Sequence, residues 1–223
     1  MKEILVAPSL LACKKGEEKE QIRTLTFAGA DILHFDVMDG KFVPNLSFTK
    51  EDYLYVRSFS TLPMDVHIMV ENPDDYVDFY GKNGAKILTF HYEALESDEE
   101  RRALLKRIRS YSMLAGISVK PQTEPDVLLP LLSDIDVILI MSVEPGKGGQ
   151  AFIMDSLEKI RYLRRIINIQ HLPILIEVDG GINNETGKLA ASAGADMLVA
   201  GSYLFHKEDV KERIAALKEK KNG

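Results

Sequence analysis

Histidine and aspartate side chains recur in this sequence at the ends of short apolar runs. His34 and Asp36 stand two residues apart in one run, His67 lies in the next, and Asp179 ends a late one. Residues two apart in an extended strand project to the same face, so His34 and Asp36 are expected side by side. Two imidazoles and two carboxylates that converge on one cavity suit a divalent transition metal. We therefore predict that these four side chains form one functional cluster.

The two aspartates of this cluster suggest a particular reaction. Inverting a stereocentre beside a carbonyl requires a base on one face of the carbon and an acid on the other. Asp36 and Asp179, on strands that face each other across a cavity, can take these two roles in turn. A nearby metal ion would stabilise the enediolate that forms when the proton leaves.

Each histidine taken alone has an ordinary structural explanation as a buried, hydrogen-bonded core residue. His91 also falls at the end of an apolar run, and His206, at the start of a charged helix, is expected to face solvent. Four metal-binding side chains at matched positions are harder to explain in this way, and the set is interpreted as functional.

Glycine-rich turns follow the last three apolar runs and predict an anion site. Glycine lets the backbone approach a phosphate closely, and late loops of parallel barrels often bind one. A short helix beginning near Ser202 would add its N-terminal amides. The candidate residues are Gly146, Lys147, Gly148, Gly149, Gly180, Gly181, Gly201 and Ser202.

Three methionines, Met38, Met69 and Met141, also fall at the ends of apolar runs. Adaptable core packing is one explanation for them. The other, equally weighted, is an apolar lining over the reacting carbon that keeps water from the enediolate.

Short apolar runs alternate with longer amphipathic segments along the whole chain, which is typical of a parallel sheet with crossover helices. The predicted strands are Ile4–Pro8, Ile32–Val37, Met64–Met69, Ile87–His91, Ala115–Val119, Val137–Met141, Ile174–Val178 and Met197–Ala200. The predicted helices include Glu17–Ala28, Asp74–Gly81, Glu99–Tyr111, Asp155–Ile167, Thr186–Ala193 and Lys207–Lys218.

An internal repeat favours eight βα units. Gly29, Gly84 and Gly194 each precede a predicted strand, and their spacings are multiples of 55 residues, the length of two βα units. We therefore predict one α/β domain over residues 1–223, a single-domain (β/α)8 TIM barrel. The alternative, a doubly wound open sheet, is disfavoured because no G-x-G-x-x-G follows the first strand. The last six residues are predicted to be a solvated tail.

Composition narrows the function classes. The chain has 223 residues, a net charge of −6 with both signs mixed throughout, and no basic stripe, which argues against nucleic-acid binding. Its single cysteine, Cys13, has no activating motif and is interpreted as structural. No apolar stretch approaches the length of a membrane span, and no leader pattern precedes the first strand. A cytoplasmic enzyme without a membrane partner is expected.

Six motifs spread from the first strand to the seventh give the chain a resemblance to the ribulose-phosphate 3-epimerase family. They are Ala7-Pro8-Ser9-Leu10-Leu11, His34-Phe35-Asp36-Val37-Met38-Asp39-Gly40, Phe42-Val43-Pro44-Asn45, Asp65-Val66-His67-Ile68-Met69-Val70, Met141-Ser142-Val143-Glu144-Pro145-Gly146 and Val178-Asp179-Gly180-Gly181-Ile182. The resemblance implies interconversion of D-ribulose 5-phosphate and D-xylulose 5-phosphate in the pentose phosphate pathway.

The resemblance also implies roles for individual residues. His34, Asp36, His67 and Asp179 would bind one divalent ion (zinc, iron, manganese or cobalt), with Asp36 and Asp179 as the acid/base pair. Ser9 and His67 would contact substrate hydroxyls, and the glycine-rich turns would hold the phosphate. Members of the family usually form dimers or hexamers, so a homo-oligomer is expected.

Three positions depart from the usual family pattern. The turn after the first strand reads Ala12-Cys13-Lys14-Lys15, the fifth strand leads into Lys120-Pro121-Gln122-Thr123, and Lys147 replaces an aromatic residue. None is a predicted metal or acid/base position. Lys147 is predicted either to reach the phosphate or to stay in solvent.

Three other functions are considered. A sister epimerase acting on D-allulose 6-phosphate would use the same chemistry in a longer cavity. A decarboxylase or aldolase on a phosphate-binding barrel would need a lysine at a strand end, where Lys120 is the candidate without the accompanying motif. A non-catalytic sugar-phosphate sensor would be expected to have lost one of the four clustered side chains, and all four are present.

Overall fold

A ring of parallel β-strands forms the centre of the computed structural model, which describes residues 3–219. The sheet order is β1-β8-β7-β6-β5-β4-β3-β2, and a parallel bridge between Ser9 and His34 joins β1 to β2 and closes the barrel. The strands are β1 (Leu5–Pro8), β2 (Leu33–Met38), β3 (Met64–Met69), β4 (Ile87–His91), β5 (Leu114–Val119), β6 (Val137–Met141), β7 (Leu175–Asp179) and β8 (Met197–Ala200).

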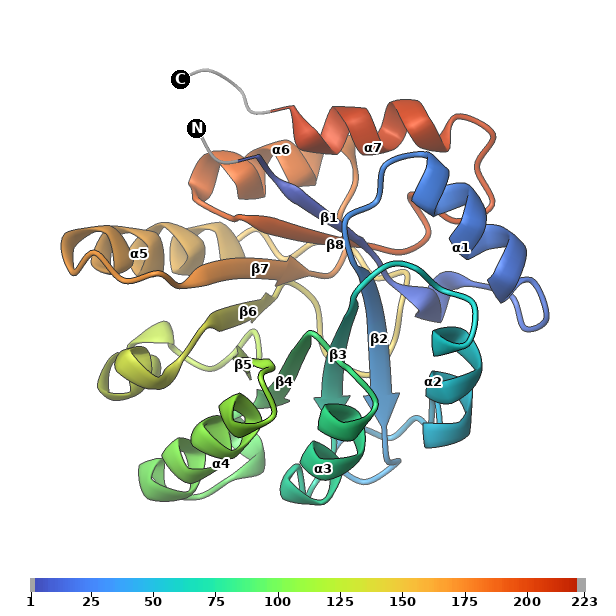
Figure 1. Ribbon diagram of the computed structural model, residues 1–223. Coiled ribbons are helices and arrows are strands. Elements are labelled where there is room, and N and C mark those ends of the chain that lie inside the picture. The colour runs from blue at the N-terminus through green and yellow to red at the C-terminus, as the bar shows by residue number, and fades with distance from the viewer. Residues whose placement is uncertain (1–2, 220–223) are drawn as a thin grey trace.

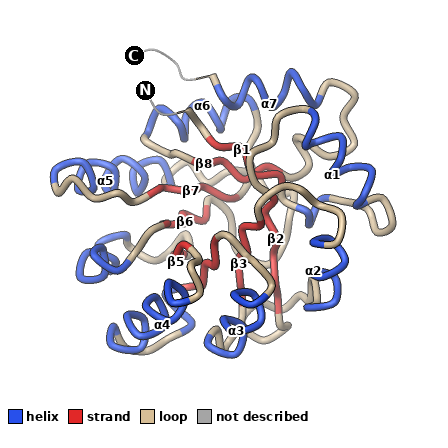
Figure 2. The backbone as a smooth tube through the Cα atoms, viewed as in Figure 1, coloured by secondary structure: helices blue, strands red, loops and turns tan. Residues whose placement is uncertain are grey.

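Helices surround this ring, with the strands inside them (Figures 1 and 2). The α-helices are α1 (Glu18–Phe27), α2 (Lys50–Arg57), α3 (Asp74–Lys82), α4 (Asp98–Ser110), α5 (Ser156–Ile169), α6 (Asn184–Ala193) and α7 (Val210–Lys218). Three 3-10 helices, η1 (Leu10–Ala12), η2 (Tyr92–Ala94) and η3 (Pro125–Asp134), follow β1, β4 and β5. The predicted (β/α)8 barrel is confirmed. None of the helices within residues 3–219 is long and apolar enough to cross a membrane.

All eight predicted strands are present, and their ends differ from the prediction by one residue at most. The helical segments α2 and η3 were missing from the prediction, as were the three-residue η1 and η2. Thr49 and Asp52 cap the start of α2 reciprocally, a signal that the sequence carries. The segment η3 is a 3-10 helix that contains Pro130, whose ring would clash with the preceding turn of an α-helix.

The expected short helix near Ser202 is not formed. The backbone N–H groups of Leu204 and Phe205 both bond to the carbonyl of Gly201, which makes a single turn, and α7 begins only at Val210. His206 lies in this turn with a φ of +59° and is exposed, as predicted. The last four residues of the predicted tail, 220–223, lie outside the described residues.

The internal repeat corresponds to a recurring turn between a helix and the strand that follows it, at the amino-terminal end of the barrel. The repeated glycines all have positive φ, +99° at Gly29, +75° at Gly84 and +121° at Gly194, and turn the chain from a helix into a strand. Two aspartates that follow them hold the neighbouring strand. Asp31 Oδ2 accepts the N–H of Val6 at 2.8 Å, and Asp196 Oδ2 accepts the N–H of Ile176 at 2.9 Å.

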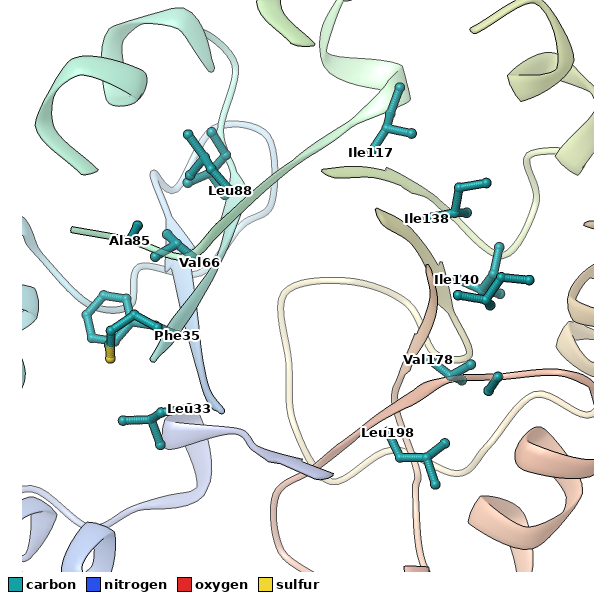
Figure 3. Close-up of a cluster of buried hydrophobic side chains, with 14 of the residues drawn as sticks. Leu33, Phe35, Val66, Ala85, Leu88, Ile117, Ile138, Ile140, Val178 and Leu198 are labelled. Carbon is teal, nitrogen blue, oxygen red and sulfur yellow. The ribbon is translucent and has the colours of Figure 1, made fainter. Parts of the chain in front are cut away.

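Apolar side chains pack both outside the barrel, against the helices, and inside it. Alternate strand residues, among them Phe35, Val66 and Ile138, point outward and pack under the helices (Figure 3). Inside the barrel, Ile87 and Val137 belong to an apolar layer at its lower end. The polar residues of the interior therefore lie above this layer, toward the carboxyl ends of the strands, where barrel enzymes carry their reactive groups.

Candidate active site

The four predicted ligands, which come from β2, β3 and β7, meet inside the barrel. Asp36 and His67 are register partners on adjacent strands, and Asp36 Oδ1 lies 3.2 Å from His67 Nδ1 and 3.3 Å from His34 Nε2. Asp179 Oδ2, from β7, lies 3.9 Å from His34 Nε2. One ligand atom from each of the four residues lies within 4.8 Å of all the others. The structure thus brings the predicted set together.

This geometry fits a divalent transition metal ion. In a tetrahedral site with bonds near 2.1 Å, neighbouring ligand atoms lie about 3.3–3.6 Å apart. The three measured separations are close to that range: 3.2 Å between His67 and Asp36, 3.3 Å between His34 and Asp36, and 3.9 Å between His34 and Asp179. His34 Nε2 is buried without a hydrogen-bond partner, although it faces both carboxylates. A cation between these atoms would satisfy it.

The two aspartates differ in their electrostatic surroundings. Burial opposes ionisation of Asp36, but the adjacent His34 and His67 outweigh it and hold the pKa of Asp36 well below its ordinary value. Burial and the negative charge of Asp36 raise the pKa of Asp179 to about 6. Environments that shift the pKa values of two carboxyl groups in opposite directions are typical of an acid/base pair.

His34 is supported from below by a second pair of acids. Its Nδ1 lies 2.5 Å from Asp65 Oδ2 and 3.4 Å from Glu177 Oε1, and all three side chains are fully buried. Burial and the neighbouring Asp65 raise the pKa of Glu177 well above its ordinary value. Burial opposes a positive charge on His34, yet Asp36 and Asp65 raise the pKa of its imidazole. The Nδ1 contact leaves Nε2 facing the ligand cluster, as metal-binding histidines require.

His67 has a different support. Its Nε2 lies 2.9 Å from His91 Nε2, and His91 Nδ1 lies 3.4 Å from Glu93 Oε2. Burial lowers the pKa of His91 to about 4, which favours a neutral ring. Burial opposes the charge of Glu93, but hydrogen bonds from His91 and Thr123 hold its pKa at about 2.

A cavity of about 840 Å³ opens above the cluster. Asp36 and Asp179 reach its surface, and Asp179 is the more exposed of the two, with 18% of its side chain accessible. Ser9 also lines the cavity and donates its hydroxyl to Asp36 Oδ2 at 2.9 Å. Met38, Met69 and Met141 are buried against the cavity wall, where they add apolar surface beside the carboxylates. His34 and His67 lie beneath this surface.

The glycine-rich turns predicted to bind phosphate all line the same cavity. Side chains cannot be accommodated at two of them: a Cβ on Gly180 would lie 2.5 Å from Val143, and one on Gly181 would lie 2.5 Å from the backbone of Phe152. The loop after β6 is held in place by Asn45, whose Nδ2 donates to the carbonyl of Gly146 at 2.7 Å. These contacts produce a wall of exposed backbone at one end of the cavity.

Lys147 stands at the mouth of this cavity with its side chain exposed. A charge in that position is screened by solvent and salt. For Lys147→Ala, assayed with the substrate that the resemblance implies, we expect an unchanged kcat and a KM within about threefold of the wild-type value. Steady-state kinetics at physiological ionic strength measure both constants. A tenfold higher KM would instead place the ammonium on the phosphate.

The protonation of Asp179 should be visible in the stability of the metal-free protein. Its pKa is raised from 3.8 to about 6, so the folded state binds this proton more tightly and loses stability as the pH rises through that interval. Asp179→Asn lacks this penalty and is expected to be more stable than the wild type by about 3 kcal/mol at pH 7.5. At pH 4 the two proteins should differ little. Urea denaturation at both pH values tests this, and a pH-independent difference would contradict it.

Four supporting residues, Asp65, Glu177, His91 and Glu93, were not in the predicted site. Asp65 and Glu177 each stand two residues before a predicted ligand, so the same-face spacing that pairs His34 with Asp36 could have placed them. His91 was noted at a strand end but given no role. Lys207 and Arg213 line the outer part of the cavity, and no pattern in the sequence indicates this.

A closed parallel barrel with a histidine/aspartate cluster at its carboxyl-terminal mouth defines a (β/α)8-barrel enzyme. Residues 5–205 match the sequence profile of the Ribulose-phosphate 3 epimerase family. The chain belongs to this family of isomerases, which act on sugar phosphates.

Several proteins named ribulose-phosphate 3-epimerase are similar to this chain over nearly its whole length. The protein of Mycobacterium tuberculosis H37Rv is 42% identical over 214 residues, covering 96% of this chain and 91% of the relative. The Escherichia coli K12 protein is 42% identical, covering 96% and 94%. The Bacillus subtilis 168 protein is 39% identical, covering 96% and 98%.

Comparison with solved structures supports the fold. A mutant tryptophan synthase α-subunit from Pyrococcus furiosus superposes with a TM-score of 0.68 at 15% identity, covering 97% of this chain and 98% of the other. A thiamine phosphate pyrophosphorylase from the same organism has a TM-score of 0.62 at 16% identity, covering 96% and 93%. At these identities the likeness concerns the barrel alone.

Proposed function

We propose that this epimerase interconverts D-ribulose 5-phosphate and D-xylulose 5-phosphate by moving a proton on and off C3. The observation that carries the proposal is the position of Asp36 and Asp179, two carboxylates of one four-ligand cluster that both reach the floor of the same cavity. The identity of about 40% to proteins named ribulose-phosphate 3-epimerase supports the choice of substrate.

We further propose that His34, Asp36, His67 and Asp179 hold one divalent ion, with zinc, iron, manganese or cobalt all compatible with this donor set. When bound, the ion would polarise the C2 carbonyl and stabilise negative charge on the enediolate. The supporting contacts are those of Asp65 to His34 and of His91 to His67.

In the proposed mechanism, the carboxylate of Asp36 removes the C3 proton from one face, and Asp179 delivers a proton to the other face. The reverse reaction exchanges their roles. The Ser9 hydroxyl, bonded to Asp36 Oδ2, orients the base. Met38 and Met141 cover the reacting carbon and exclude water.

At the other end of the substrate, the phosphate is proposed to lie against backbone amides of the glycine-rich turns. These are Gly146, Gly148, Gly149, Gly180, Gly181, Gly201 and Ser202. A contact between His67 and a substrate hydroxyl stays a prediction, and in the described structure the ring nitrogens of His67 face Asp36 and His91.

A six-carbon substrate, D-allulose 6-phosphate, is the second candidate, because a cavity of about 840 Å³ has room for one more carbon. Turnover measured on both ketose phosphates separates the two. We expect kcat/KM for ribulose 5-phosphate to exceed that for the hexose phosphate by more than about tenfold, since one carbon unit of fit is worth 1–3 kcal/mol. The opposite order would assign the hexose substrate.

A Schiff-base aldolase is disfavoured by the position of Lys120. Its Nζ lies 4.1 Å from the centre of the Phe42 ring, and the residue does not line the cavity. Within residues 3–219, the lysines that line the cavity, Lys147 and Lys207, are both exposed. A homo-oligomer, dimer or hexamer, and a cytoplasmic location remain predictions, the first testable by analytical ultracentrifugation.

A further inference from the structure

A line of buried polar groups leads from His67 away from the cavity to the loop after β5. His67 Nδ1 faces Asp36 Oδ1 at 3.2 Å, and His67 Nε2 faces His91 Nε2 at 2.9 Å. Both histidines are fully buried. Two ring nitrogens at that distance share one proton, so one must donate and the other must accept.

The tautomer of His67 decides whether it can bind a metal ion. Nδ1 is the nitrogen that faces the other ligands, so it must have a free lone pair, and the ring proton must stay on Nε2. That Nε2–H then donates to His91 Nε2. His91 must accept with its Nε2, and its own proton therefore belongs on Nδ1.

Glu93 is placed to keep the His91 proton on Nδ1. Its Oε2 lies 3.4 Å from His91 Nδ1, and neither atom has a hydrogen-bond partner elsewhere among the described residues. Its other oxygen, Oε1, accepts the backbone N–H of Lys120 at 2.8 Å and also the hydroxyl of Thr123. The carboxylate is thus anchored on one side and presents an acceptor to His91 on the other.

We propose that His91 and Glu93 are positioning residues that fix the tautomer of His67, so that its Nδ1 is free for the metal ion. This inference rests on the proposed metal site. Neither residue touches the substrate cavity, so both act through His67. Glu93 is held by the Lys120–Thr123 turn, so the orientation of His67 on β3 depends on the loop after β5. In that loop the sequence departs from the usual family pattern.

Replacing Glu93 by glutamine tests the proposal with almost no change of shape. The Lys120 N–H needs an acceptor, so the amide oxygen takes the Oε1 position and the amide NH2 faces His91 Nδ1. An NH2 group there donates, which makes His91 Nδ1 the acceptor, moves its proton to Nε2 and forces His67 to carry its proton on Nδ1.

For Glu93→Gln we therefore expect two changes. Long-range 15N–1H spectra recorded with excess zinc should show the His67 proton on Nε2 in the wild type and on Nδ1 in Glu93→Gln. The dissociation constant for zinc, measured by competition with a chromophoric chelator, should rise about 10–100-fold. Glu93→Asp keeps a carboxylate and should restore the wild-type tautomer and part of the affinity. It also tests the proposal if Glu93→Gln does not fold.

Thr123→Val is the matched control. It removes one donor to Glu93 but leaves the carboxylate and the Lys120 bond in place, so both the tautomer and the zinc affinity, within about twofold, should be unchanged. A Glu93→Gln protein with the wild-type tautomer and zinc affinity would overturn this inference alone. A wild-type protein that binds no zinc and keeps its turnover in chelator would overturn the metal site and this inference together.

Discussion

Replacing Asp179 by asparagine is expected to lower kcat for ribulose 5-phosphate about 10²–10⁴-fold, the usual contribution of one positioned general acid or base. Asparagine keeps the shape of the side chain and an oxygen toward His34. With the divalent ion in excess, so that changing a proposed ligand does not empty the site, the loss should come from proton transfer and leave KM within a few fold. A coupled spectrophotometric assay of xylulose 5-phosphate formation measures both constants.

Isotope exchange gives this prediction a sharper form. With two bases on opposite faces, Asp36 alone can still remove the C3 proton of the one epimer that presents it to that side. In heavy water, Asp179→Asn should exchange C3 of one epimer without inverting it, while the other epimer stays unexchanged. Equal exchange of both epimers would contradict the assignment of one carboxylate to each face.

Glu144→Gln is the matched control for this variant. Glu144 also lines the cavity and carries a carboxylate, but its side chain is exposed at the mouth and bonds to Gln122. Removing its charge should change kcat less than about twofold, in keeping with most surface substitutions. A large effect of Glu144→Gln would mean that the cavity responds to net charge and not to Asp179 in particular.

Removing the divalent ion is expected to lower turnover about 10³-fold, because the enediolate would lose several kcal/mol of charge stabilisation. Within the described residues, Asp36 and Asp179 form ion pairs with histidine only, so no lysine or arginine replaces the cation there. Dialysis against a chelator followed by titration with zinc, manganese, cobalt or iron(II) measures loss and recovery. The melting temperature should rise with added ion, because the ion binds the folded state.

His34→Gln should reproduce the effect of the chelator, since it removes the ligand whose Nε2 faces both carboxylates. His206→Gln serves as its control, because His206 is an exposed histidine in a surface turn. Turnover that survives both exhaustive chelation and His34→Gln would contradict metal dependence. If His206→Gln lost turnover equally, the loss in His34→Gln could not be assigned to a missing metal ligand, and this would argue against a role for the cluster.

The strands and the grouping of the four clustered side chains could be predicted because their signals are local. A strand buried on both faces reads as a short apolar run, and two-residue spacing fixes which side chains share a face. His34 and Asp36 are therefore adjacent in any parallel barrel built from this sequence. The position of Asp179 opposite them followed from the strand count, which the glycine repeat supplied.

Other parts of the site depend on contacts between distant segments. The opposite pKa shifts of Asp36 and Asp179 require burial and a specific pattern of neighbours, which no spacing rule contains. The contact of Glu93 with the Lys120 backbone joins two loops whose sequences carry no sign of it. The turn at Ser202 was misjudged as a helix because glycine and serine suit both structures.

Proton exchange at C3 of ribulose 5-phosphate, followed by NMR in heavy water with and without a chelator, tests the central claim most directly. We predict rapid loss of the C3 proton signal with the wild-type protein, and loss of that exchange when the chelator is added. Asp36→Asn should likewise fail to exchange the epimer whose C3 proton faces Asp36. Exchange that continues unchanged in chelator and in Asp36→Asn would show that this cluster does not carry the reaction.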